Sequence, residues 1–137
     1  MAKFLVMLTE DPAYWAKYTP EQMGDVIRQY VAWGMKMQAT RRMKVGHKLV
    51  DEGGKRLTAA RGRLKVTDGP YAESHEVVGG FYVMEADSYD QAAKLLAGHP
   101  HLAHGQRIDL RAIETVGGRR GGGGGGGKRK AGAKKPR

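Results

Sequence analysis

Apolar residues near the N-terminus follow first the period of a strand and then that of a helix. Residues 3–8 (KFLVML) form a short apolar run, typical of a strand buried on both faces. Thr19, Pro20 and Gln22 then have the order of an N-cap, a first-turn proline and the third residue of a capping box. We expect a helix to about residue 38, with Met35 and Met37 as core filler. The residues predicted to form its buried face are Met23, Val26, Ile27, Tyr30, Val31 and Gly34.

The middle of the chain is less regular. Residues 43–50 predict a weak strand, and a turn with paired glycines follows it at residues 51–54. Residues 55–58 and 64–67 predict two short strands around a basic loop, and an Asp-Gly-Pro turn ends this region.

Residues 77–85 (VVGGFYVME) predict the strongest strand, because its apolar side chains point to both faces. Gly79 and Gly80 within it indicate a bulge or a close backbone approach, beside a cleft or a dimer seam. No helix start follows these glycines, so they do not form a phosphate-binding loop. Residues 107–114 alternate cleanly, with Ile108 and Leu110 on the apolar face.

A second helix is predicted between these two strands. Ser88 and Gln91 have the spacing of a capping box, and apolar residues follow until Gly98 and Pro100 stop the helix. The order of elements is therefore β-α-β(β)-β-α-β, an α+β fold with the split βαβ arrangement of ferredoxin-like sandwiches. Two helices can cover only one face of that sheet, although two of its strands are apolar on both faces. We therefore predict a homodimer whose sheets pack face to face.

Composition narrows the class of protein. The chain has 137 residues, no cysteine, 24 basic and 14 acidic residues and a formal charge of +10. One domain is expected at this length, and no stretch approaches the ~18 apolar residues of a membrane helix. The short N-terminal apolar run does not resemble a signal peptide, so we expect a cytoplasmic protein with no membrane contact. The absence of cysteine excludes disulfides, thiol catalysis and cysteine-ligated zinc.

The positive charge is concentrated at the C-terminus. Residues 1–116 contain 16 basic and 14 acidic residues, whereas residues 117–137 contain eight basic residues, no acid and ten glycines. We expect a folded domain at 1–116 and a disordered glycine-rich basic tail at 117–137. The tail is either a solvated extension or a weak, non-specific nucleic-acid contact. The residues for the second alternative are Arg119, Arg120, Lys128, Arg129 and Lys130.

One block carries a family resemblance. Residues 68–87 (DGPYAESHEVVGGFYVMEAD) resemble the signature of the YCII-related, DGPF-type proteins: Asp-Gly-Pro-aromatic-Ala-Glu, then Gly-Gly-aromatic, then a strand ending in Glu-Ala-Asp. The resemblance covers roughly residues 1–115. It implies a ferredoxin-like domain that dimerises into an α/β barrel, mostly without an assigned reaction, and some relatives accompany alternative sigma factors.

The resemblance also implies a departure in the site. The YCII branch is proposed to pair a His on the first helix with an Asp just before the Pro that follows the second helix. Here no histidine precedes His47, and His99 stands before Pro100. The His–Asp dyad therefore does not carry over, and whether the chain is an enzyme stays open.

A candidate ligand site is expected in the cleft between sheet and helices. Its predicted residues are Asp68, Tyr71, His99, His101 and Arg107. Asp68 would act as a base or bind substrate at the cleft mouth, or instead cap its own turn. Arg107 would hold an anion, or instead pair with charges across the sheet. Asp68, His99 and His101 are the candidates for catalysis, if there is any.

The histidine cluster admits several interpretations. His99, His101 and His104 lie within six residues, and imidazoles bind metals and ligands. No carboxylate pattern signals a metal geometry, so we expect neither a metal nor another cofactor. His99 could instead interact with the C-terminus of the second helix. The sequence thus favours a small dimeric ligand-binding module, with an accessory protein that acts through its basic tail, on nucleic acid or in regulation, as the alternative.

Overall fold

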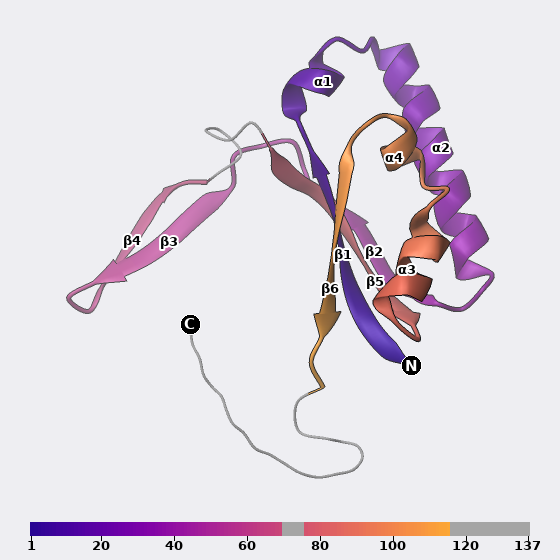
Figure 1. The fold of residues 1–137 in the computed structure, drawn as a ribbon. Helices are drawn as coiled ribbons and strands as arrows, with labels where there is room; N and C mark the ends of the chain where they lie inside the picture. Colours follow the sequence, from indigo (N-terminus) through magenta and orange to yellow (C-terminus); the bar gives the residue numbers. More distant parts are fainter. Residues whose placement is uncertain (70–75, 116–137) are drawn as a thin grey trace.

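The described protein is an α+β domain built on a four-stranded antiparallel sheet (Figure 1). The structure is a computed structural model that describes residues 1–69 and 76–115. The sheet order is β2-β5-β1-β6, with β1 (Ala2–Glu10) and β5 (Val77–Ala86) in the centre. β2 (Met43–Lys48) and β6 (Arg107–Ile113) form the edges. The strands and helices predicted from the sequence are present in the predicted order, with three strands instead of two between the long helix and β5 and with two further short helices.

The helices lie on one face of this sheet (Figure 1). α2 (Pro20–Gln38) and α3 (Tyr89–Leu96) are the two predicted helices, and the Thr19–Gln22 capping box is present with both hydrogen bonds. At α3 the Ser88 cap is confirmed, but the Gln91 side chain accepts from the Asp87 amide and from Arg42 instead of closing a box. Gln91 bonds to Arg42 because a hydrogen bond from a charged guanidinium is stronger than one from the backbone amide of Ser88, which a capping box would use.

Two short helices were not predicted. α1 (Pro12–Ala16) is capped by the Asp11 carboxylate, which accepts from the amide of Ala13. α4 (Pro100–Ala103) is capped by the imidazole of His99. The alternative contact of His99 with the end of α3 is present through its backbone amide, which donates to the Leu96 oxygen at 2.9 Å, while its Nδ1 atom accepts at the start of α4.

The core lies between the helices and the sheet. Residues 4, 6 and 8 of β1 face the helices opposite Met84 and Tyr82 of β5, and helix residues complete the layer. Burial of these side chains is the main stabilising contribution to such a layer. Its fully or nearly buried members are Phe4, Val6, Leu8, Trp33, Met37, Met84, Ala86, Ala92 and Leu96.

β3 (Lys55–Ala60) and β4 (Arg63–Asp68) form a separate two-stranded hairpin, as predicted. Arg61 and Gly62 at its tip both have positive φ, the conformation of a tight two-residue turn that matches the strand twist. The hairpin projects from the end of the sheet on the side opposite the helices (Figure 1). It therefore contributes nothing to the core between helices and sheet.

Candidate functional site

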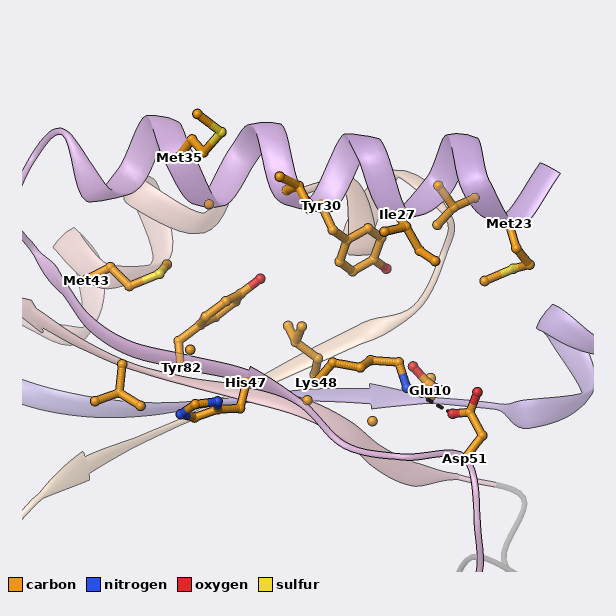
Figure 2. A pocket seen from close by; sticks show the side chains of 18 of the residues that line it. Glu10, Met23, Ile27, Tyr30, Met35, Met43, His47, Lys48, Asp51 and Tyr82 are labelled. Carbon is orange, nitrogen blue, oxygen red and sulfur yellow. Dashed lines mark hydrogen bonds and ion pairs between the residues drawn. The ribbon is translucent and has the colours of Figure 1, made fainter. Parts of the chain in front are cut away.

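A cavity of about 560 Å³ lies between α2 and the strands β1, β2 and β5 (Figure 2). Volumes of this size are typical of small-molecule sites. Its wall on the helix side is apolar, with Met23, Ile27, Val31 and Met35. The strands contribute the floor and most of the polar groups, so the cavity is an apolar space with a few polar positions.

The cavity explains why the predicted buried face of α2 was partly wrong. Val26, Trp33 and Met37 are buried in the core, but Ile27, Val31 and Met35 are 55%, 54% and 66% exposed. Helical spacing identifies an apolar stripe but not its partner. Half of this stripe faces the open cavity instead of packed side chains, and Met35 is therefore not core filler.

Three glycines form the cavity floor. A Cβ atom on Gly46 would lie 2.8 Å from the ring carbon Cδ1 of Tyr82. A Cβ on Gly79 would meet the Glu10 carboxylate, and one on Gly80 would lie 3.0 Å from the backbone oxygen of His47. The predicted irregularity at the Gly-Gly pair is confirmed, since the register of β1 and β5 shifts beside Gly80. These glycines let Tyr82, Glu10 and the backbone of β2 approach closely, because any other residue at these positions would bring a Cβ atom against them.

Tyr82 and His99 form the first of two buried pairs behind this cavity. The Nδ1 atom of His99 accepts from the backbone amide of His101 at 2.9 Å, so it carries no proton. Nε2 of the neutral ring must then be protonated, and it donates to the Tyr82 hydroxyl at 2.8 Å. Burial, and secondarily His101, lowers the pKa of His99 to about 4 and keeps the ring neutral.

Tyr30 and His101 form the second pair with the opposite polarity. The Nε2 atom of His101 lies 2.8 Å from the backbone oxygen of Thr9, which can only accept, so Nε2 is the donor. Burial lowers the pKa of His101, although its backbone hydrogen bonds oppose the shift. In the neutral ring Nδ1 is therefore an acceptor, and the Tyr30 hydroxyl donates to it at 2.5 Å.

The two pairs give the cavity one donor and one acceptor. Both tyrosines line the cavity, as Figure 2 shows. The Tyr82 oxygen already accepts from His99, so its own proton is available for a ligand. The Tyr30 proton is used on His101, so its oxygen is left to accept. Burial raises the pKa of Tyr82 to about 12 and also raises that of Tyr30, so both hydroxyls stay protonated at neutral pH.

Charged groups lie at one end of the cavity (Figure 2). Burial raises the pKa of the Glu10 carboxyl, an effect that Lys48 opposes and Asp51 reinforces. Lys48 forms an ion pair of 2.9 Å with Asp51, and both side chains are largely exposed. Glu10 is therefore the lining carboxylate best suited to exchange a proton with a ligand.

The structure separates the residues of the predicted site. Asp68 lies at the end of β4, where its side chain is 83% exposed and 3.5 Å from the Lys55 ammonium. Arg107 lies on β6 and pairs with Glu76 and Asp109. Neither lines the cavity under α2. Tyr71 lies outside the described residues, as do the tail residues predicted to contact nucleic acid. His99 and His101 are brought together, but as buried supports behind the two tyrosines.

The third histidine of the cluster points elsewhere. The Nδ1 atom of His104 lies 3.1 Å from the hydroxyl of Tyr14 on α1. Within residues 1–69 and 76–115, no group of three or more His, Asp or Glu side chains is arranged to hold a metal ion. Over the same ranges, no helix has both the length and the hydropathy to cross a membrane.

Sequence reasoning missed the residues that shape the cavity. Tyr30 was interpreted only as a member of a helical apolar stripe, and Tyr82 only as a strand residue. A buried histidine needs hydrogen-bond partners, and a tyrosine is a common one, so the histidine cluster was the available signal. Gly46, in a weak strand of the sequence, offered no such signal.

Comparisons with known proteins found one matching family and a similar solved structure. The model of the YCII-related domain matches residues 2–114. No match was found among curated proteins. A similar solved structure is 5-chloro-2-hydroxyhydroquinone dehydrochlorinase (TftG) from Burkholderia phenoliruptrix AC1100, in complex with 2,5-dihydroxybenzoquinone. It is 19% identical with a TM-score of 0.46, over 84% of this chain and 95% of that chain. Because the family model spans nearly all the described residues, this chain belongs to the YCII-related domain family.

Proposed function

We propose that this domain binds a small, largely apolar organic molecule in the cavity under α2. The observation that carries the proposal is the Tyr82 hydroxyl, whose proton has no acceptor among residues 1–69 and 76–115 once His99 donates to its oxygen. A ligand oxygen placed against Tyr82 would satisfy that donor, and the apolar wall would cover the rest of the molecule. The charged end with Glu10 and Lys48 favours a ligand with a second polar group.

A cavity-filling substitution tests this proposal. Gly34 lines the cavity and nothing lies within 4 Å of its Cβ position, so Gly34→Leu fills the space without a clash. Gly24→Leu is the matched control, because Gly24 lies on the same helix outside the cavity, 3.7 Å from the flexible end of Arg28. Both substitutions replace a helical glycine and should not unfold α2.

Calorimetric titrations with naphthalene, 2-naphthol and 2-naphthoate supply the measurement. We expect the two oxygenated probes to bind more tightly than naphthalene, with a loss of at least tenfold in Gly34→Leu and none in Gly24→Leu. Tyr82→Phe should weaken the oxygenated probes by about fivefold, because one hydrogen bond contributes about 1 kcal/mol. Binding that Gly34→Leu leaves unchanged would contradict the proposal, as would a wild type that binds none of the probes at millimolar concentration.

We also propose that the domain dimerises through the sheet face opposite the helices, into an α/β barrel. The register places Leu5, Met7, Phe81 and Val83 on that face, and no described helix covers it (Figure 1). An uncovered apolar sheet face marks an association site. Light scattering at micromolar concentration should give the mass of two chains, and a monomer would contradict the dimer but not the ligand site.

A second candidate function rests on the basic segment 117–137, with its eight Lys and Arg residues. It predicts weak, non-specific nucleic-acid binding that falls steeply with salt and disappears when residues 117–137 are deleted. Binding that survives this deletion would contradict it.

A further inference from the structure

The two faces of the β3–β4 hairpin differ in chemistry. Leu57 is paired with Val66 and Ala59 with Leu64, so these four side chains share one face. Leu57, Leu64 and Val66 are 61%, 66% and 52% exposed. The opposite face has the pairs Arg56–Thr67, Thr58–Lys65 and Ala60–Arg63. The hairpin therefore has one basic face and one face that is apolar except for the Lys55–Asp68 ion pair at its base.

The apolar face has no described partner in its own chain. All twelve residues of the two strands are exposed, and the base of the hairpin is joined by a bond from the Gly69 amide to the Gly54 oxygen. An isolated two-stranded hairpin is marginally stable in water, and exposed apolar strands promote association. A surface that covers Leu57, Leu64 and Val66 would supply the missing stability.

The direction in which the hairpin projects indicates which surface covers its apolar face. The hairpin extends on the side of the sheet opposite the helices, which is the side of the uncovered face (Figure 1). Its six-residue strands span about 20 Å, whereas packed sheets lie only about 10 Å apart. A hairpin rooted at the end of one sheet would therefore extend past the full thickness of a sheet packed against it.

The area needed for a stable dimer also indicates that a second copy of this chain covers the apolar face of the hairpin. Such interfaces bury about 800 Å² on each partner, from 20 to 30 residues a side. A four-stranded sheet face supplies fewer side chains than that. Its apolar members are Leu5, Met7, Val45, Val78, Phe81, Val83 and Ile113. The apolar face of the hairpin extends this surface in the same direction.

We infer that the β3–β4 hairpin is an arm that clasps a second copy of this chain. Leu57, Ala59, Leu64 and Val66 pack on the partner, while the basic face stays in water. The inference rests on the sheet-to-sheet dimer proposed above and adds to it a second contact surface, contributed by an insertion between two strands of the main sheet.

A pair of matched double variants tests the arm. Leu57→Asp with Leu64→Asp places two carboxylates on the apolar face, and Thr58→Asp with Thr67→Asp places two on the basic face. In both variants the new charges lie diagonally across the hairpin and the net charge changes equally. Sedimentation equilibrium measures the dimer dissociation constant of each.

We expect the apolar-face variant to weaken the dimer at least tenfold and the basic-face variant to stay within threefold of wild type. A dimer that both variants leave within threefold would overturn the arm while keeping the sheet dimer, and so would equal weakening by both. A wild type that is monomeric throughout would overturn the dimer itself and the arm with it. Titration of the cavity with 2-naphthoate is independent of all these results.

A label on the native hairpin gives a second measurement that needs no charged variant. The chain has no cysteine, so Ala59→Cys and Ala60→Cys each provide one attachment site, on the apolar and basic face respectively. With acrylodan attached, emission at position 59 should shift to the blue as concentration rises through the dimer range, whereas position 60 should not. Equal spectra at both positions would contradict the arm, and a shift at position 60 caused by added oligonucleotide instead would assign the hairpin to nucleic acid.

Discussion

The space between the helices and the sheet is packed on one side and hollow on the other. On the packed side, Phe4, Val6 and Leu96 are buried in one hydrophobic cluster. Over β2 and β5, beneath α2, a cavity remains, and the helix residues Ile27, Val31 and Met35 that line it stay more than half exposed. Both regions are lined by apolar residues. The difference teaches that an apolar helix stripe does not by itself decide where the interior is packed, because α2 buries Trp33 and Met37 but leaves Ile27 exposed at the cavity.

The largest expected contrast is in the cost of truncation. Phe4→Ala in the packed region should lower the free energy of unfolding by about 3–5 kcal/mol, because it leaves a buried cavity. Ile27→Ala beside the hollow region should cost less than about 1 kcal/mol, because Ile27 is already half exposed and alanine favours the helix. Urea denaturation of the two variants checks this, and equal losses would contradict the division into two regions.

Lowering the pH should destabilise the protein through its buried histidines. Unfolded, the imidazole of His99 binds a proton below about pH 6.5, but in the folded protein its pKa is about 4. Between these values the unfolded state binds more protons, so the free energy of unfolding falls as pH falls, by about 3 kcal/mol. His101, whose pKa burial also lowers, acts in the same direction.

Denaturation of the wild type and of His99→Gln between pH 4 and 7 gives the comparison. The variant should show a shallower pH dependence, whatever its absolute stability. His47→Gln, at an exposed position on β2, serves as the control and should keep the slope of the wild type. A slope unaffected by His99→Gln would show that this imidazole is not held neutral by burial.

Enlarging a side chain should change the free energy of unfolding in opposite directions in the two regions. Ala92 is fully buried in α3, so Ala92→Leu should destabilise the protein by about 1–3 kcal/mol through overpacking. Gly34→Leu enters the cavity and should stabilise the protein by about 0.5–1 kcal/mol, because it removes a helical glycine. Thermal unfolding measures both shifts. Destabilisation by Gly34→Leu would mean that the cavity closes in solution.

Local signals in the chain predicted most of the framework. Thr19 and Gln22 marked the start of α2, the alternating pattern marked β6, and turn residues marked the hairpin. These signals are local because each depends on hydrogen bonds or periodicity within a few residues. The caps of α1 and α4 were missed, since a single turn has too few residues to show a helical period.

The site was predicted less well. His99 and His101 were singled out as site candidates, which stays a prediction, and their hydrogen bonds to Tyr82 and Tyr30 join residues 17 and 71 positions apart. Asp68 resembled a cleft residue because it ends a strand before a Gly-Pro turn. That strand belongs to the projecting hairpin, so the carboxylate lies away from the cavity under α2.

The amino-acid sequence by itself determined the order of strands and helices, the family, and the two-sided apolar strands that predict association. It did so because periodicity, caps and turn residues act over short distances. Only the tertiary structure decided where the hollow lies and which hydroxyl carries a free proton. Those features depend on the contact of Gly46 with Tyr82 and the hydrogen bond of Tyr82 with His99, and contacts between residues so far apart in the chain have no local pattern.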